Sequence, residues 1–498
     1  MYLGIDCGTQ GTKALLVDDQ GVAIGRGYAP HALIERATGA REQDPQWWLD
    51  AVRDSVRQAV AGHDHDGSTV LALGVSGQQH GLVVLDEEYR VIRPAKLWND
   101  TETTPQNEEL IRRFGGKEIF FERFGIVPLT GYTVSKLLWL KEQEPENFER
   151  IRHILLPHEY INFWLTGEIC AEYGDASGTG YFDVRTRSWI KEVLDEIDGG
   201  TGLLFKALPR LIHAEEMVGP VRAEIAAQLG VTSSCLVSSG GGDNMMGAIG
   251  TGNVAEGVVT LSLGTSGTVF SFRNQTAVDP SGNIAPFCSS SGGWLPLVCT
   301  MNVTNVVTQT VQLLGSEIKE IDPALQGTEP GAGGITFIPF LNGERTPDLP
   351  QAHGTLLGIS SSNFTHNNLI RATVEGVTFG LLNGLKRILE QERPTRILVI
   401  GGGARSAQWR QLIADATGIA VEVPLEQEAG CLGACIQAKY AYLHTSGKPE
   451  SFESLTSACF RIDETKAAAP CPDKLASYEA AHALYEAHLK NLYGEAAS

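Results

Sequence analysis

A short phrase of glycine and threonine occurs twice in this chain, about half the chain apart. Gly8-Thr9-Gln10-Gly11-Thr12 returns as Gly264-Thr265-Ser266-Gly267-Thr268. Each copy follows an apolar run and leads into another, which predicts a β-hairpin with a small polar tip. Glycine lets the backbone approach a ligand closely, and the N–H groups of a tight turn bind anions. The repeat therefore predicts two related domains that hold one polyphosphate from opposite sides.

The two copies differ in an informative way just before the tip. Asp6 stands two residues before the first tip, where the second copy has Ser262. A carboxylate repels a phosphate unless a cation lies between them, so we expect Asp6 to face a Mg²⁺ ion. Lys13 follows the first tip and is either a phosphate ligand or a solvated strand residue.

Length, charge and cysteine content narrow the class of protein. With 498 residues the chain exceeds the size of one hydrophobic core, and the repeat predicts two domains over residues 1–252 and 253–498. A formal charge of −20 argues against nucleic acid or an anionic membrane as a partner. No apolar segment approaches the roughly 18 residues of a membrane span, and no signal peptide is evident. Nine scattered cysteines suit reduced thiols, so we expect a cytoplasmic protein.

Strand patterns and helix patterns alternate along the chain. The expected strands span 70–76, 82–85, 235–239 and 396–400, and the expected helices span 46–61, most of 108–165, 408–417 and a segment near the C-terminus. Each half opens on a hairpin. This order predicts α/β domains with mixed β-sheets flanked by helices.

Two glycine-rich turns precede predicted helices. Gly402-Gly403 lies between a strand and a helix, where backbone N–H groups and a helix N-terminus can meet a nucleotide phosphate. The alternative is a crowded turn in which glycine only relieves steric contact.

Asp243 follows three glycines and opens a helix. It is either an N-cap or a base that accepts a proton from a substrate hydroxyl during phosphoryl transfer. Because three glycines exceed what a cap needs, we favour the base.

Two polar clusters follow predicted strands. Gln78-Gln79-His80 and Trp98-Asn99-Asp100 combine amides, an imidazole and an indole, which together suit a polyol. In α/β folds the ends of strands carry ligand-binding residues. His80 alone is typical of a structural histidine, but its amide neighbours favour a substrate site.

Three other features are assigned structural roles. His63-Asp64-His65-Asp66 lies in a polar segment and is interpreted as a solvated turn. Cys431 and Cys435 share one helix face and are expected to pack in a core. Trp47-Trp48 is expected to anchor a helix on its sheet.

Taken together, these motifs resemble the FGGY carbohydrate kinases, a family with the actin-like ATPase fold. The resemblance covers residues 1 to about 445. Its motifs are two phosphate segments, an adenosine segment and two signatures, over residues 3–17, 261–270, 399–406, 131–140 and 354–375. Five motifs in the right order make the resemblance specific.

The resemblance implies two ribonuclease-H-like domains with ATP and a sugar in the cleft between them. Asp243 corresponds to the catalytic base and Asp6 to the carboxylate on the Mg²⁺ side. The residues implied at the ATP phosphates are Gly8, Thr9, Gln10, Lys13, Gly264 and Thr265. Gly402 and Gly403 would lie at the α-phosphate and nucleoside, and Gln309, in the helix after the second hairpin, would also contact nucleotide.

Within the family, the segments around Gln79, Trp98 and Asp243 are similar to those of xylulose kinases. That similarity implies phosphorylation of D-xylulose to D-xylulose 5-phosphate, with Gln79, His80, Trp98 and Asn99 as sugar ligands. Gln79 stands where xylulose kinases often carry Met, so ribulose, gluconate or glycerol remain alternatives. An alternative of another class is an actin-like ATPase that acts on a protein partner. A homodimer is a further expectation.

Overall fold

The structure is a computed structural model that describes residues 1–61, 70–389 and 392–494. The chain forms two compact units, each assembled from segments far apart in the sequence. The first comprises Met1–Val254, Arg273–Leu295 and Glu428–Phe460, and the second comprises Ala255–Phe272, Pro296–Gln427 and Arg461–Ser498. The domain boundary at residue 252 was predicted from the sequence repeat. It stays a prediction. The histidine-rich segment 63–66 lies outside the described residues.

The sheet of the first unit is built around the N-terminal hairpin. Strand β1 pairs antiparallel with β2 and parallel with β6, and β2 pairs antiparallel with β3. The full order is β14-β15-β6-β1-β2-β3, with β16 beside β6. The bounds are β1 Tyr2–Cys7, β2 Gly11–Val17, β3 Ala23–Pro30, β6 Ala72–Gly77, β14 Met217–Pro220, β15 Leu236–Ser238 and β16 Gly241–Gly242.

The sheet of the second unit repeats this pairing pattern. Strand β17 pairs antiparallel with β18 and parallel with β23, while β18 pairs antiparallel with β20. Strand β24 extends the sheet beyond β23. The bounds are β17 Val258–Leu263, β18 Gly267–Ser271, β20 Trp294–Thr300, β23 Arg396–Ile400 and β24 Val421–Glu422. The repeat seen in the sequence is therefore a repeat of strand topology, and the predicted mixed sheets are confirmed.

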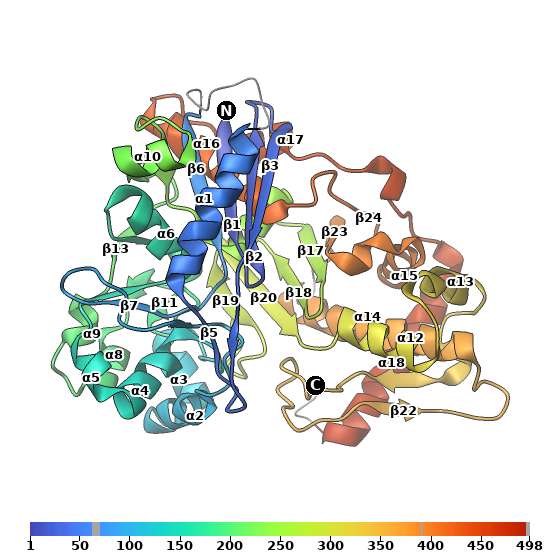
Figure 1. Cartoon of the computed structure of the whole chain (residues 1–498). Helices are drawn as coiled ribbons and strands as arrows, with labels where there is room; N and C mark the ends of the chain where they lie inside the picture. The colour runs from blue at the N-terminus through green and yellow to red at the C-terminus, as the bar shows by residue number, and fades with distance from the viewer. Residues whose placement is uncertain (62–69, 390–391, 495–498) are drawn as a thin grey trace. The chain divides into compact units, whose positions relative to one another are not determined.

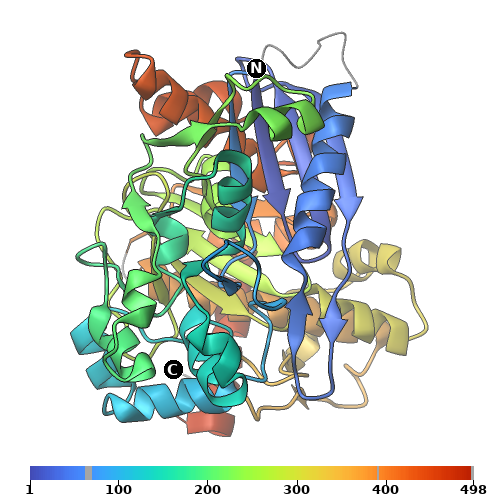
Figure 2. The ribbon, with the colours of Figure 1, turned by 60° about the vertical axis from the view of Figure 1, so that its left-hand side comes forward.

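Two helices cover the opposite faces of the first sheet. Helix α1 (Pro45–Ala61) lies along β2 and β3 (Figures 1 and 2), and its Trp48 is buried in one core with Leu3 and Ile5. Helix α16 (Ala429–Thr445) packs on β1 and β6. Gly4 and Gly74 stand opposite each other in register, and a Cβ on either would meet an α16 carbonyl oxygen within 2.4 Å. These glycines let α16 approach the sheet closely.

The remaining elements are mostly short. Helices of the first unit are α2 Thr104–Arg113, α3 Lys117–Phe124, α4 Thr133–Gln143, α5 Pro145–Glu149, α6 Pro157–Thr166, α7 Tyr173–Ala176, α8 Lys191–Asp198, α9 Leu203–Lys206, α10 Ala223–Leu229, α11 Asp243–Gly250 and α17 Phe452–Cys459. Its minor strands are β4 Ile34–Glu35, β5 Arg41–Gln43, β7 Val83–Leu85, β8 Ala95–Lys96, β9 His153–Leu155, β10 Cys170–Glu172, β11 Phe182–Asp183, β12 Ser188–Trp189, β13 Arg210–Ile212 and β19 Ala285–Cys288. The second unit adds α12 Thr304–Leu313, α13 Ile321–Gln326, α14 His366–Leu389, α15 Ala407–Thr417, α18 Pro472–Tyr493, β21 Thr336–Ile338 and β22 Thr355–Leu357.

The cysteines and helices agree with the expectations from composition. All nine cysteines are free, and Cys431 and Cys435 are buried on α16, as expected for core packing. Among the described helices, none has the length and apolar character needed to cross a membrane.

Candidate active site

Strand pairing brings the predicted acidic and sugar-binding residues of the first unit to one edge of the sheet. Strands β1, β6 and β16 run parallel, so Asp6, Ser76 and Gly241 stand side by side. The carboxyl ends of parallel strands meet at the same edge. Gln79 and Asp243 follow β6 and β16 at that edge. Two carboxylates and an amide loop, distant in sequence, therefore share one location.

The three glycines before Asp243 are explained by packing. Gly240 has φ 66°, and a Cβ there would lie 2.3 Å from the Val75 carbonyl oxygen. A Cβ on Gly242 would lie 2.8 Å from Cγ of Gln79. Strand β6 and the residues after it therefore approach this loop so closely that a side chain at these positions would collide with them.

Asp243 is the first residue of α11, and Gly242 holds the N-cap position. The carboxylate accepts hydrogen bonds from the backbone N–H of Asn244 at 2.8 Å and from its side-chain amide at 3.1 Å. Burial raises the pKa of Asp243 to about 7, and the negative charges of Asp6 and Asp175 act in the same direction. A carboxylate with a pKa near neutrality suits proton transfer.

A buried ion pair lies next to this loop, and no motif in the sequence indicated it. Nδ1 of His158, on α6, lies 2.7 Å from Oδ2 of Asp175, on α7. The other carboxylate oxygen of Asp175 would lie 3.1 Å from a Cβ on Gly242. Burial alone lowers the pKa of His158, but the hydrogen bond and charge of Asp175 outweigh it and raise the pKa to about 8.

Asp6 is held from one side and left uncovered on another. Its Oδ1 accepts a hydrogen bond from the Ser76 hydroxyl at 2.6 Å. A Cβ on Gly430 would lie 3.0 Å from the Asp6 carboxyl carbon, so the glycine leaves that carboxylate uncovered. Burial raises the pKa of Asp6. Lys13 forms a 2.5 Å ion pair with Glu428, and both side chains are partly exposed.

The loop after β6 holds Gln79 and His80 by different means. Oε1 of Gln79 accepts a hydrogen bond from the side chain of Asn244 at 2.9 Å. His80 has φ 64°, and its ring stacks on Tyr132 with centroids 4.5 Å apart. A Cβ on Gly178 would lie 2.4 Å from Cε1 of His80, so glycine is needed there.

The carbonyl oxygen of His80 is fixed from α4. It accepts hydrogen bonds from Nζ of Lys136 at 2.5 Å and from the hydroxyl of Thr133 at 3.2 Å. Lys136 is fully buried, and burial lowers its pKa to about 7. The signature segment 131–140 thus positions the loop that carries Gln79 and His80.

The first hairpin tip contacts the second polar cluster directly. Nε1 of Trp98 donates a hydrogen bond to the Thr9 hydroxyl at 3.0 Å. Gly8 closes the tip with a 3.1 Å hydrogen bond to the Gly11 carbonyl, and Gln10 is exposed. The Oδ1 atom of Asn99 is buried and has no hydrogen-bond partner among the described residues.

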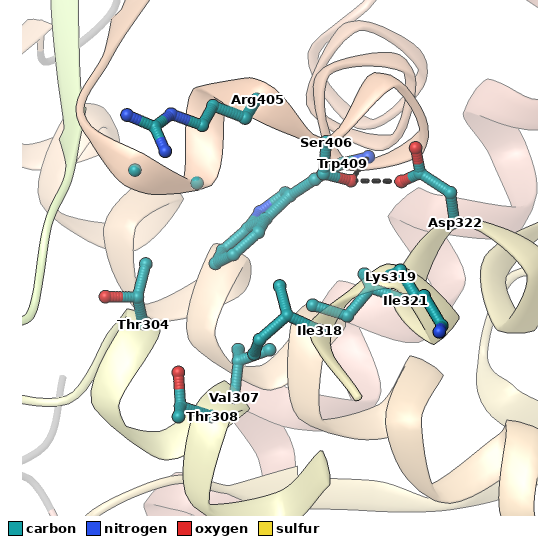
Figure 3. A pocket seen from close by; sticks show the side chains of 12 residues that line it. Thr304, Val307, Thr308, Ile318, Lys319, Ile321, Asp322, Arg405, Ser406 and Trp409 are labelled. Carbon is teal, nitrogen blue, oxygen red and sulfur yellow. Dashed lines mark hydrogen bonds between the residues drawn. The ribbon is translucent and has the colours of Figure 1, made fainter. Parts of the chain in front are cut away.

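The second unit contains a pocket beside its own hairpin. Strand β23 runs parallel to β17, which places the turn at 401–403 beside Gly264. The Gly264 carbonyl accepts a 3.0 Å hydrogen bond from the backbone N–H of Thr304. A cavity of about 420 Å³ opens here, with Trp409 and Ile318 among its apolar walls (Figure 3). Its lining residues include Gly402, Gly403, Thr304, Thr308, Asp322 and Ser406.

Three predicted nucleotide residues of this unit, Gly264, Thr265 and Gln309, are not among the residues that line the pocket. Gln309 is exposed on α12 and is not among the lining residues, whereas Thr304 and Thr308 of the same helix are. Thr265 is exposed at the hairpin tip. The roles predicted for all three residues stay predictions.

Comparison with known proteins decides the family. The N-terminal domain of the FGGY family of carbohydrate kinases matches residues 1–250, and the C-terminal domain of that family matches residues 259–442. The chain belongs to the FGGY family of carbohydrate kinases. It is 46% identical to the xylulose kinase of Haemophilus influenzae over 99% of this chain and 100% of the relative.

Solved FGGY kinases share the fold along the whole chain. A xyloylose kinase from Brucella ovis superposes with a TM-score of 0.90 at 31% identity and covers 99% of both chains. A gluconate kinase from Lactobacillus acidophilus has the same TM-score at 25% identity, covering 99% of this chain and 98% of the other. As an FGGY carbohydrate kinase, the protein is an enzyme that uses ATP and a small sugar or polyol.

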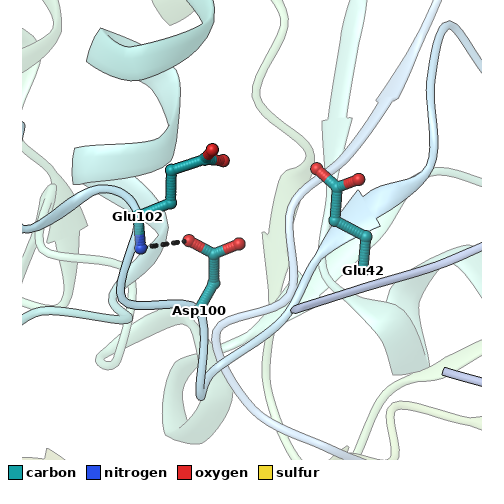
Figure 4. A group of neighbouring side chains, drawn as sticks. All are labelled: Glu42, Asp100 and Glu102. Carbon is teal, nitrogen blue, oxygen red and sulfur yellow. Dashed lines mark hydrogen bonds between the residues drawn. The ribbon is translucent and has the colours of Figure 1, made fainter. Parts of the chain in front are cut away.

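One acidic group in this FGGY kinase resembles a metal site but contains a lysine. Glu42, Asp100 and Glu102 lie close together (Figure 4). Nζ of Lys96 lies within 3.2 Å of all three carboxylates, so an ammonium group already balances them. We therefore interpret the cluster as a structural charge network, formed in part by Lys96 and Asp100 on either side of Trp98.

Proposed function

We propose that this enzyme transfers the γ-phosphate of ATP to the terminal hydroxyl of D-xylulose and forms D-xylulose 5-phosphate. The convergence of Asp6, Asp243 and the Gln79-His80 loop at one sheet edge carries the proposal. Such a group offers a base and directional hydrogen bonds to a sugar. The relative from Haemophilus influenzae supports xylulose as the sugar.

Asp243 accepts the proton of the terminal hydroxyl as its oxygen attacks the γ-phosphorus. The bond between that phosphorus and its bridging oxygen breaks, and ADP leaves. In a loose transition state the base contributes chiefly by positioning the hydroxyl. Gln79, His80, Trp98 and Asn99 hold the sugar, and their amide, imidazole and indole groups give it one orientation.

We propose that the two domains span 1–252 and 253–498 and that the hairpin of each contributes nucleotide ligands. Backbone N–H groups of the first tip stabilise charge on the transferred phosphoryl group. The pocket around Gly402 and Gly403 takes the nucleoside, because its apolar walls suit a base and its glycines leave backbone N–H groups accessible. The proposed phosphate ligands are Gly8, Thr9, Gln10, Lys13, Gly264 and Thr265, with Gln309 as a further nucleotide contact.

Asp6 suits a hard divalent cation, and we assign it to the Mg²⁺ side of the site. It offers carboxylate oxygens, one of them oriented by Ser76, and Gly430 leaves the group uncovered. Carboxylates with substrate phosphates are the usual Mg²⁺ ligands. When bound with ATP, Mg²⁺ neutralises charge on the phosphates. Location in the cytoplasm and a homodimeric state stay predictions.

A coupled assay of ADP release tests the substrate. The panel contains D-xylulose, D-ribulose, gluconate and glycerol, since a gluconate kinase shares the fold with an equal TM-score. We expect the highest kcat/KM with D-xylulose, and ATP turnover without any sugar at least 100-fold slower, because closure on the sugar excludes water. A higher kcat/KM for any other compound overturns the assignment of xylulose. Turnover that no sugar accelerates overturns the kinase reaction itself.

A further inference from the structure

A circuit of five hydrogen bonds connects the first hairpin tip to Trp98, one of the proposed sugar ligands. Its members are Trp48, Gln43, Gln78, Thr9 and Trp98. Trp48, Gln43 and Gln78 are buried to 99% or more. In a buried site every such bond is costly to lose, because water cannot replace the missing partner.

The direction of each bond in this circuit is fixed by the indole groups. An indole N–H can only donate, so Trp48, at 2.9 Å, must face the amide oxygen of Gln43. Gln78 also donates to that oxygen at 2.9 Å. The amide nitrogen of Gln43 is therefore free to donate elsewhere, and the amide oxygen of Gln78 is left to accept.

Both remaining groups act on Thr9. The Gln43 nitrogen also donates to the Ala32 carbonyl at 2.8 Å and lies 3.1 Å from Nδ1 of His31. Gln43 donates to the Thr9 carbonyl at 2.8 Å, and the Thr9 hydroxyl donates to Gln78 at 3.1 Å. The hydroxyl also accepts from the indole of Trp98 at 3.0 Å. Carbonyl and hydroxyl of one phosphate-hairpin residue are thus held by two glutamines and by one residue of the sugar site.

We propose that Gln43 is a positioning residue for the phosphate hairpin, and that the Trp98–Thr9 hydrogen bond makes sugar and nucleotide strengthen each other's binding. The proposal rests on the function proposed above. Trp98 is half-buried, so a bound sugar can pack on its indole and immobilise it. An immobilised indole fixes Thr9, so the hairpin loses less conformational entropy when the nucleotide binds.

The test compares Kd values for MgADP, measured by calorimetry on the full-length enzyme with and without saturating D-xylulose. We expect D-xylulose to tighten MgADP binding about tenfold in the wild type, within the range of typical coupling. Linkage requires MgADP to tighten D-xylulose binding by the same factor. If the substrate screen selects another sugar, that sugar replaces D-xylulose in the measurement.

Two variants separate coupling from simple binding. Trp98→Phe keeps an aromatic ring but removes the indole N–H together with the rest of the pyrrole ring. Gln43→Met removes the bond to the Thr9 carbonyl along with the other hydrogen bonds of Gln43, to Ala32, Trp48 and Gln78. We expect the coupling factor to fall below about twofold in both, with each ligand still bound alone, whereas typical coupling is about fivefold or more. Trp47→Phe, one residue from Trp48 and outside the circuit, is the matched control and should keep the full factor.

The outcomes distinguish the two proposals. If the wild-type enzyme phosphorylates the sugar but the two ligands do not strengthen each other's binding, the proposed coupling through Trp98 and Thr9 is overturned. The proposed kinase function is then unaffected. The same holds if Trp98→Phe retains the wild-type factor. Should Gln43→Met fail to fold, Trp98→Phe alone decides, because it leaves all three buried members of the circuit in place.

Discussion

His158 and Asp175 form a hydrogen-bonded pair 2.7 Å apart, and neither side chain is more than 1% exposed. Asp175 also faces the glycine that precedes Asp243. Without the imidazolium, a buried carboxylate would repel the charged form of the proposed base. The imidazolium of His158 therefore balances the charge of Asp175 beside the proposed base.

Replacing His158 should change the proton affinity of the proposed base. In His158→Gln the Asp175 charge is unbalanced, so the pKa of Asp243 rises and the acid limb of the kcat/KM profile moves to higher pH. The variant should also lose roughly 3–5 kcal/mol of stability, as expected when one partner of a buried pair is removed. His488→Gln, on α18 of the other unit, should leave the pH profile unchanged. An unshifted acid limb in His158→Gln would refute the electrostatic role.

The stability of the folded enzyme should fall as pH rises from about 6 to 8. Buried Lys136, whose pKa is lowered to about 7, acts in the opposite direction above pH 7 and offsets part of this fall. Folding raises the pKa of His158 to about 8, so its stabilising contribution is complete below the unfolded value of about 6.5 and is lost above 8. The pKa values of Asp243 and Glu159 rise to about 7 and about 8, and these acids also favour the folded state less as pH increases. Thermal melts across this range test the sign, and a Tm that increases with pH contradicts it.

Asp243→Asn should separate activity from stability. The amide cannot accept the proton, so kcat should fall about 10²–10⁴-fold. Because the folded protein no longer carries a desolvated charge at this position, Tm at pH 8 should increase relative to the wild type. A normal kcat with D-xylulose would remove Asp243 from the reaction. Asp54→Asn, at an exposed residue of α1, serves as the control.

The proposed sugar-binding loop at Gln79 and His80 can be displaced without replacing a polar side chain. In Gly178→Ala the new methyl would lie 2.4 Å from the His80 ring, so the ring must move. We expect KM for the sugar to increase about tenfold or more, with the KM for ATP changed less than twofold, since a displaced contact costs roughly 1–3 kcal/mol. Gly247→Ala, in α11 with no neighbouring atom within 4 Å, is the matched control. Equal sugar KM values for the two variants would count against a role for His80.

The pocket of the second unit can be filled from α12. Thr308→Trp places a large side chain in the cavity of about 420 Å³ and should raise the KM for ATP at least tenfold, with the sugar KM nearly unchanged. Leu313→Trp on the same helix is the control, because Leu313 is 86% exposed and outside the lining. An unaltered ATP KM in Thr308→Trp would place the nucleoside elsewhere.

Much of the candidate site was predictable because its residues occur in short motifs that are recognisable along the sequence. The doubled Gly-Thr phrase predicted two hairpins, and both are present with the same strand pairing around them. Asp243 and Gln79 were recognised as candidates from the glycines and amides beside them. The three glycines were explained only by the structure, because close packing against β6 is a contact between segments distant in sequence.

By itself the sequence determined the elements, since hydrophobic periodicity and turn residues act within a few positions along the chain. Only the tertiary structure decided which of those elements meet. Strand register placed Asp6 beside Ser76. Packing between elements distant in sequence buried His158 against Asp175 and joined two glutamines and two tryptophans in a circuit around Thr9. Such pairings depend on desolvation and on hydrogen-bond directions in a shared core, and neither is encoded in any one segment.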